Sequence, residues 1–343
     1  MIKQLVRGMT VPAVLALVVA GCGAPADVPD DANGGGQADG FPVTVENCGR
    51  TLTFDRPPER VVTGYHPVFE TMVELGLGDR IIGRTNFEEN GPEGFLPGHK
   101  KVYDAVPEIS ETIDLPQKEV LVAQQPDFVI DLSYAAFDAA EGLATVEELD
   151  AVAAATYITA GGCGPQAGAV KLDDIFADFR TLGAIFGVPE QAAELIARYQ
   201  ALLDDVEQRV RDREPVDVLA IWSGAEPIGV FGGGSLIDQM IEIAGGHNVL
   251  GDLDEDYPEI SSERIAVTRP EAVLVGYYDL YFGERQPSAQ QKAQAVFSVV
   301  PESPAAQRNR YLPVRIVDTN PGPGSILAIS KIAEFLHPEG FTR

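Results

Sequence analysis

The residues best suited to chemistry in this sequence are aromatic and polar side chains, most of which follow short apolar runs. They are Thr63, Tyr65, His66, Asn86, Phe87, Tyr134, Trp222, Ser223, Tyr257, Tyr277, Tyr278 and Asn320. Ligands of α/β domains bind beyond the carboxyl ends of the strands, where such side chains would gather. Aromatic rings there could stack on a broad, rigid molecule. We therefore take as candidate ligand-binding residues Tyr65, His66, Phe87, Tyr134, Trp222, Tyr257, Tyr277, Tyr278 and Asn320.

Each of these residues also has a purely structural interpretation. A tyrosine at a strand end can pack inside its own domain without touching a ligand. His66 precedes Pro67 at a predicted turn from strand to helix. It could line the binding site or cap that helix.

The sequence gives little support for catalysis or for a metal centre. The four histidines (His66, His99, His247 and His337) are scattered and form no HExxH motif. The run GVFGGGS at residues 229–235 lacks the lysine and the spacing of a phosphate-binding loop, so we expect Ser235 to cap a helix. No Ser-His-Asp or Cys-His set has a recognisable spacing. We expect no enzyme, no metal site and no resident cofactor.

Alternating strands and helices must position the candidate residues. Apolar runs predict strands over 60–64, 80–84, 127–132 and 156–159, and again over 216–221, 272–275 and 315–318. Residues 41–45 and 51–54 predict a hairpin. Residues 189–212 predict one helix about 36 Å long at ~1.5 Å per residue. The predicted fold is two three-layer α/β lobes, residues 41–170 and 214–343, joined by a helical connector over 171–213, with the ligand cleft between them.

A repeated segment indicates that the two lobes share a plan. EVLVAQQPDFVI at 119–130 and ERIAVTRPEAVL at 263–274 each run from a Glu through a helical stretch to Pro, an acidic residue and an apolar strand. Glu119 and Glu263 are 263 − 119 = 144 residues apart, and the two prolines keep this offset. A glutamate in the first turn of a helix is favoured by the helix dipole, which by itself would explain both glutamates.

The first 40 residues are predicted to lie outside the fold. Residues 1–21 combine two basic residues with an apolar run over 11–20, which is typical of a secretory signal and too short to span a bilayer. The run ends in VAGC, which looks like a bacterial lipobox, so we expect Cys22 to carry a lipid; the alternative is an ordinary signal with an incidental cysteine. Residues 22–40 are predicted to form a flexible tether. The protein is therefore expected to be extracytoplasmic, lipid-anchored to the cell membrane and monomeric.

Two cysteines remain in the predicted exported chain. Cys48 and Cys163 would close a loop of 163 − 48 = 115 residues as a disulfide, the bond expected of a cysteine pair in an oxidising compartment. Two free thiols and a shared metal are the alternatives, although a metal pair without nearby histidines is a poor zinc site.

The charge of the chain excludes one class of partner. The formal net charge is −27, and removal of Lys3 and Arg7 with the signal leaves 23 basic against 52 acidic residues, or −29. Binding to nucleic acid requires positive charge on the protein, so we exclude it. A neutral or cationic ligand would suit this charge, although solubility explains it equally well.

Several motifs, in this order, resemble the substrate-binding lipoproteins of ABC importers for ferric siderophores, cobalamin and related large ligands. They are VTVENCGRTLTF at 43–54, PERVV at 58–62, ELG at 74–76, Glu119 followed by PDFVI at 126–130, Glu263 followed by PE at 270–271, and LHPE at 336–339. The resemblance covers nearly all of residues 41–340. It implies two lobes joined by one long helix.

The resemblance also implies roles for single residues. Glu119 and Glu263 match the surface glutamates, one on each lobe, that dock against arginines of the membrane permease. Phe87, Trp222 and Tyr257 match positions that are often aromatic in cobalamin and siderophore binders. Ile113 departs from the cobalamin-like pattern, in which an aromatic residue is expected opposite Tyr257.

These observations lead to one expected function and three alternatives. We expect a lipid-anchored receptor that binds a ferric siderophore between its lobes and delivers it to an ABC permease and its ATPase. A receptor for cobalamin, or for another cyclic cofactor or precursor, is the first alternative. An exported hydrolase and a surface interaction protein without a small ligand are the other two.

Overall fold

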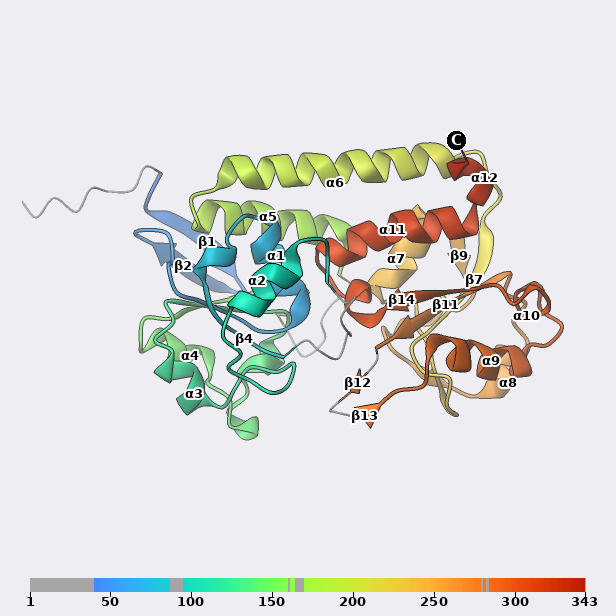
Figure 1. Ribbon diagram of the computed structural model, residues 1–343, viewed down its shortest axis with the longest axis horizontal. Helices are drawn as coiled ribbons and strands as arrows, with labels where there is room; N and C mark the ends of the chain where they lie inside the picture. Colours follow the sequence, from blue (N-terminus) through green and yellow to red (C-terminus); the bar gives the residue numbers. More distant parts are fainter. Residues whose placement is uncertain are drawn as a thin grey trace, which may run out of the picture. The chain divides into compact units, whose positions relative to one another are not determined.

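The computed structural model describes residues 40–86, 95–159, 161–163, 170–278, 280–281 and 284–342 (Figure 1). The predicted signal, the predicted tether up to residue 39, Cys22 and Phe87 lie outside the described residues. Within the described part of the chain, no helix is long and apolar enough to cross a membrane.

The N-terminal lobe is built on a four-stranded parallel sheet. Its strands are β3 (Val61–Thr63), β4 (Ile81–Arg84), β5 (Phe128–Asp131) and β6 (Ala155–Ile158), in the order β4-β3-β5-β6. β3 and β5 are buried along their whole length, as expected for parallel strands covered on both faces. The predicted hairpin is confirmed: β1 (Val43–Asn47) pairs with β2 (Arg50–Phe54) in antiparallel register.

Short helices follow the strands of this lobe. They are α1 (His66–Glu74), α2 (His99–Ala105), α3 (Lys118–Ala123) and α4 (Val146–Asp150), with single 3₁₀ turns η1 (Gly78–Arg80), η3 (Tyr134–Phe137) and η4 (Ala139–Glu141). Pro67 starts α1, where its missing N–H costs no hydrogen bond. A capping box between Thr145 and Glu148 starts α4.

Two helices connect the lobes. α5 (Leu172–Ile185) is followed by α6 (Pro189–Val210), a helix of 22 residues that confirms the long helix predicted from the sequence. Its buried residues recur at helical spacing: Ala192, Leu195, Ile196, Tyr199, Leu203, Val206 and Val210. α6 contacts α5 at one end and α7, α11 and α12 at the other (Figure 1).

The C-terminal lobe has a second four-stranded parallel sheet. It contains β7 (Val216–Ile221), β9 (Gly246–Asn248), β11 (Ala272–Tyr277) and β14 (Tyr311–Arg315), in the order β14-β11-β7-β9. Two small antiparallel pairs join β8 (Ile228–Gly229) to β10 (Glu259–Ile260) and β12 (Leu280–Tyr281) to β13 (Glu284–Arg285). The helices are α7 (Leu236–Ile243), α8 (Ser262–Ala266), α9 (Ala289–Val299), α10 (Pro304–Arg308), the 3₁₀ turn η5 (Ile316–Thr319), α11 (Pro323–Leu336) and α12 (Pro338–Phe341).

The two sheets have the same topology, which accounts for the repeated segment. Taken in chain order, each sheet places its second, first, third and fourth strands side by side. In the N-terminal lobe, the Asp127 carboxylate accepts the backbone N–H of Arg60 (2.8 Å) at the start of the first strand. In the C-terminal lobe, Glu271 accepts the N–H of Asp217 at 3.4 Å and donates its own N–H to the Asp217 carbonyl (2.7 Å). The acidic residue after each proline therefore ties the start of one buried strand to its neighbour.

One strand prediction was wrong, and several elements were missed. The strand expected at 315–318 runs over Tyr311–Arg315, and the apolar residues that suggested it form the turn η5. Pro313 is tolerated because β14 lies at the edge of its sheet. The missed elements include α2, β9, α9, α10, α12 and the two small antiparallel pairs β8–β10 and β12–β13; β9 has only three residues, too few to show a pattern.

Candidate ligand-binding site

A cavity of about 640 Å³ lies at the carboxyl end of the N-terminal sheet and includes residues of the C-terminal lobe. The N-terminal lobe contributes the end of β5, the turn that follows it, and the segment around Ile113. The C-terminal lobe contributes Asp256 and Tyr257 before β10, and Asn320 and Pro321 before α11. This volume lies within the ~300–1,000 Å³ of small-molecule sites.

Three of the predicted ligand-binding residues line this cavity: Tyr65, Tyr257 and Asn320. Tyr65 is the residue before α1, and its backbone N–H points to the Asp131 carboxylate (3.3 Å). The Tyr257 side chain is 48% exposed, and its ring meets that of Phe231 edge-on at a centroid distance of 5.6 Å. The amide of Asn320 is oriented by donation from Nδ2 to the Ile316 carbonyl (3.0 Å).

Four other predicted residues are described but are not among the residues that line the cavity. Trp222 lies over Gly229, where an added Cβ would come within 2.3 Å of the indole ring. Tyr134 is 38% exposed in η3, between two residues that do line the cavity. Tyr277 and Tyr278 are half-buried at the end of β11. Trp222 therefore packs within its own lobe because a glycine opposite leaves room for the ring.

His66 requires a correction. Its side chain is fully buried and is not among the residues that line the described cavity. Its Nε2 instead lies 3.1 Å from Oε1 of Glu70, one helical turn away, and its ring lies 5.0 Å from that of Phe95. The His66 imidazole is therefore packed between Glu70 and Phe95.

Sequence reasoning missed the most buried polar residue of the cavity, Asp131. This carboxylate is 4% exposed at the end of β5 and accepts the backbone N–H of Ser133 (3.1 Å). Burial raises the pKa of Asp131 to about 6, and donors such as the N–H of Ser133 only partly oppose this. A Cβ at Gly64 would lie 1.7 Å from Oδ2 of Asp131, so the close approach of β3 requires a glycine. The available signal was its place next to the carboxyl end of the strand predicted over 127–132.

The polar lining of the cavity is acidic. Among the described lining residues there are four carboxylates (Asp114, Asp131, Glu141 and Asp256) and no Lys, Arg or His. Burial raises the pKa of Asp114 and of Asp256 as well. Ile113, where the family resemblance led us to expect an aromatic residue, does line the cavity together with Tyr257.

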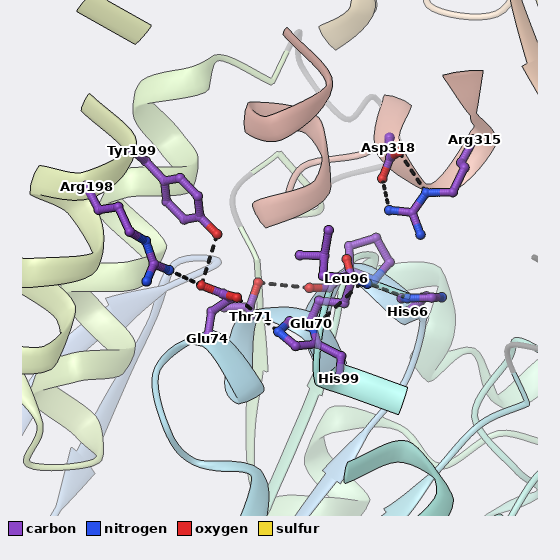
Figure 2. Close-up of polar contacts among 11 residues, drawn as sticks. His66, Glu70, Thr71, Glu74, Leu96, His99, Arg198, Tyr199, Arg315 and Asp318 are labelled. Atoms are coloured by element: carbon purple, nitrogen blue, oxygen red, sulfur yellow. Dashed lines mark hydrogen bonds and ion pairs between the residues drawn. The ribbon is translucent and has the colours of Figure 1, made fainter. Parts of the chain in front are cut away.

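A buried ionic network ties α1 to α2 (Figure 2). Glu70 of α1 is 2% exposed, contacts His66 and accepts the backbone N–H of Leu96 (3.1 Å). His99 of α2 lies with Nε2 3.0 Å from Oε1 of Glu74, and with Nδ1 3.8 Å from Oε1 of Glu70. Burial acts to raise the pKa of Glu70, but His66, the charge of Arg315 and the backbone N–H of Leu96 together outweigh burial, so this pKa is lowered.

The same network extends to the connecting helix α6. Figure 2 shows Arg198 and Tyr199 of α6 converging on the Glu74 carboxylate; the Tyr199 hydroxyl donates to Oε2 at 3.1 Å, and Arg198 forms an ion pair with it. Burial acts to raise the pKa of Glu74, but the hydrogen bond with His99 and the charge of Arg198 act in the opposite direction. The net result is a lowered pKa. Among the described residues, no group of three or more His, Cys, Asp or Glu side chains is placed to hold a metal ion.

The predicted docking glutamates lie at matched places on the two lobes. Glu119 is in the first turn of α3, before β5, and Glu263 is in the first turn of α8, before β11. Both side chains are exposed. A hydrogen bond with Ser261 lowers the pKa of Glu263, so this side chain is charged at neutral pH.

The predicted disulfide is present. Cys48 and Cys163 are bonded with their Cα atoms 5.0 Å apart, which links the β1–β2 turn to the segment after β6. Asn47 strengthens this link, because its side chain donates to the Ile158 carbonyl (2.7 Å) and accepts the Ile158 N–H (2.9 Å).

Comparison with known proteins identifies the family of this chain. A family model described as a periplasmic binding protein matches residues 61–307. The chain is 20% identical, over 95% of each sequence, to an uncharacterised ABC transporter substrate-binding lipoprotein, YvrC, of Bacillus subtilis (strain 168). A cobalamin-binding protein of Halobacterium salinarum is 25% identical over 69% of this chain and 59% of its own length.

A solved structure gives the same result. The structure described as an ABC-type Fe3+-hydroxamate transport system from Saccharomonospora viridis superposes with a TM-score of 0.68 and 27% identity, covering 88% of this chain and all of that one. Residues 61–307, which the family model matches, contain the strands from β3 to β11 and the connecting helices α5 and α6. This chain belongs to the periplasmic binding protein family.

Proposed function

We propose that this protein is the lipid-anchored, extracytoplasmic receptor of an ABC importer and that it binds a ferric siderophore in the cavity described above. The observation that carries the proposal is the cavity itself: about 640 Å³ at the end of a parallel sheet, with Tyr257 and Asn320 supplied by the other lobe. A ligand that touches both lobes can favour their closure, and a closed receptor is distinguishable from an empty one by its permease.

The proposed ligand class rests on similarity together with size. The structure from Saccharomonospora viridis, 27% identical, is described as part of a Fe3+-hydroxamate transport system. A ferric tris-hydroxamate is a compact chelate with an apolar exterior, and it suits a cavity that mixes Tyr257, Ile113 and Leu132 with polar groups.

Cobalamin is the second candidate, and one observation favours it. Relatives of this chain carry the names cobalamin-binding protein and vitamin B12-binding protein. Against it, Ile113 supplies no flat aromatic surface opposite Tyr257. Cobalamin also has more than twice as many non-hydrogen atoms as a ferric tris-hydroxamate and would need a larger cavity.

Delivery of the ligand would use the two exposed glutamates. We assign Glu119 and Glu263 to contacts with basic residues of the permease, one contact from each lobe. The two glutamates occupy corresponding positions on two lobes of the same topology, which supports this assignment. If the receptor docks through both lobes, the distance between the two contacts changes when the lobes close, so the permease can distinguish the closed state. An ATPase would complete the importer. Cys22 would hold the receptor at the membrane through its lipid.

The test is a calorimetric titration of the purified full chain in detergent with four ligands of different class. The ligands are ferrioxamine B, ferric enterobactin, cyanocobalamin and haemin. We expect saturable one-to-one binding of a ferric siderophore with Kd below about 1 μM, equivalent to roughly −8 kcal/mol. Binding of cyanocobalamin alone would replace the siderophore assignment with the cobalamin one. Binding of none of the four by protein with an intact disulfide and normal circular dichroism would refute both.

A further inference from the structure

We infer that the cavity selects its ligand by charge: it takes chelates of zero or positive net charge, and Asp114, Asp131, Glu141 and Asp256 are the residues that exclude anionic ones. This inference rests on the proposed function, because it concerns the same cavity and names the class of ferric chelate that would occupy it. The cavity has a volume of about 640 Å³ and a lining from both lobes, and the only charged side chains among its described lining residues are these four carboxylates.

The four carboxylates are not balanced by cations inside the cavity. No described lining residue is basic, and the internal segments outside the described residues contain no Lys or Arg in their sequence. Asp131 would add to the repulsion of a negative ligand, because its carboxylate is buried in the wall of the cavity. The negative charge of Asp114 acts together with burial to raise the pKa of Asp131. A positive ligand would relieve this repulsion, whereas a negative one would increase it.

Two buried cations of the C-terminal lobe are already engaged elsewhere and are not among the described lining residues. Arg315 is paired with Asp318, with Nε 2.8 Å from Oδ2. Lys292 donates from Nζ to the carbonyls of Trp222 (2.9 Å) and Gly276 (3.0 Å). Both cationic groups are therefore bound to partners that are not among the described lining residues of the cavity.

The charge of a ferric chelate follows from its donor groups. Three hydroxamates each carry one negative charge and together neutralise Fe³⁺, so a tris-hydroxamate is neutral, or cationic if it bears a free ammonium group. Three catecholates carry two negative charges each and give a chelate of charge −3. Like charges brought together in a partly buried site repel each other, so the trianion is the disfavoured form.

The test separates charge from shape by using one chelate in three charge states. Ferrioxamine B carries +1 through its free ammonium group, its N-acetyl derivative is neutral and its N-succinyl derivative carries −1. Kd is measured for each with the full chain at pH 7.5, in 20 mM and in 500 mM NaCl. Ferric enterobactin serves as the trianion. We expect affinity to fall in the order +1, 0, −1, and the trianion to bind at least about tenfold more weakly than ferrioxamine B.

Matched variants test the assigned residues. Asp256→Lys should weaken the binding of ferrioxamine B and strengthen the binding of the N-succinyl derivative. The ratio of their Kd values should therefore shrink by about tenfold at low salt. Asp254→Lys makes the same charge change at an exposed residue that is not among the described lining residues. This variant should leave the order of affinities for the three derivatives unchanged. Salt should weaken binding of the cationic chelate and leave the neutral one nearly unaffected.

The outcomes distinguish this inference from the proposed function. Equal affinity for the three derivatives, or tighter binding of the trianion, would overturn the charge selection while leaving a siderophore receptor in place. An equal response of Asp254→Lys and Asp256→Lys would overturn the assignment to the cavity. Failure of every ferric chelate to bind correctly folded protein would refute the proposed function, and the inference with it.

Discussion

At the scale of single residues, the polar groups of the cavity are held by their own lobe before any ligand arrives. Asn320 is oriented by the Ile316 carbonyl, and Asp131 by the backbone N–H of Ser133. Tyr257 is the exception, because nearly half of its surface is exposed and its ring touches Phe231 only at the edge. A ligand would therefore gain most of its new apolar contact from this ring.

Replacement of Tyr257 by alanine should weaken ligand binding by about tenfold to a hundredfold, since a well-buried aromatic contact contributes on the order of 1–3 kcal/mol. Calorimetry with ferrioxamine B measures the change. Trp222→Phe is the matched control, because Trp222 is not among the residues that line the described cavity. A greater loss in Trp222→Phe than in Tyr257→Ala would show that the ligand lies elsewhere.

The buried Glu70 should make the fold sensitive to acid. The pKa values of Glu70 and Glu74 are lowered, so their contribution to stability is complete above their unfolded pKa near 4.5 and is lost as pH falls through the folded values. Glu70→Gln should lower the free energy of unfolding at pH 7 by on the order of 3 kcal/mol and flatten its decrease toward pH 3.

Urea unfolding at pH 7, 4 and 3 measures this effect. Glu194→Gln on the exposed face of α6 is the control, and it should behave as the parent chain does. A Glu70→Gln variant as stable as the parent at pH 7 would show that the network contributes no net stability.

At the scale of elements, the β1–β2 hairpin is fastened to β6 by one covalent bond and several hydrogen bonds. Besides the disulfide and Asn47, Arg50 donates from its guanidinium to the Thr156 carbonyl (2.7 Å). The covalent bond spans 115 residues of sequence, so it acts mainly on the unfolded chain.

The double variant Cys48→Ser with Cys163→Ser should therefore keep the native fold but lose about 4–5 kcal/mol of stability in the chain-entropy model. Urea unfolding with and without dithiothreitol measures the loss. The reductant should destabilise the parent chain and leave the variant unchanged. If the parent and the variant unfold at the same urea concentration, the bond contributes nothing.

The matched helices α3 and α8 lead to a prediction about transport. Glu119→Lys and Glu263→Lys should leave the Kd of the ligand unchanged, because neither residue is among those that line the described cavity, and should reduce uptake through the permease several-fold each. The control is Glu147→Lys, which changes an exposed glutamate in the first turn of α4. Unimpaired uptake in the Glu119→Lys, Glu263→Lys double variant would exclude docking through these residues.

Elements with strong local signals could be predicted from the sequence, and short or edge elements could not. We could predict the buried strands, the long helix and the repeated Pro-acidic segment. Burial on both faces gives a strand a continuous apolar run, and a long amphipathic helix repeats its apolar residues over several turns. The edge strand at Tyr311–Arg315 was obscured by Pro313 and by the apolar turn after it. The cavity was only partly predictable: strand ends indicate where it lies, but the contact of His66 with the buried Glu70 and the packing of Trp222 on Gly229 depend on the folded structure.

At the scale of the whole molecule, the two sheets of equal topology and the helix α6 form the architecture, and the network around Glu74 fixes α1 to that helix. The net charge of −27 then acts on any ligand that approaches.

The most direct test of a ligand held between the lobes is hydrogen–deuterium exchange with and without saturating ferrioxamine B. A ligand bound between the lobes should slow exchange in two separated groups of segments, with no change in α4 or α10. The segments are residues 112–117 and 131–136 in one lobe and residues 256–257 and 320–321 in the other. Protection confined to one lobe, or found only at surfaces away from these segments while the chelate is bound, would contradict it.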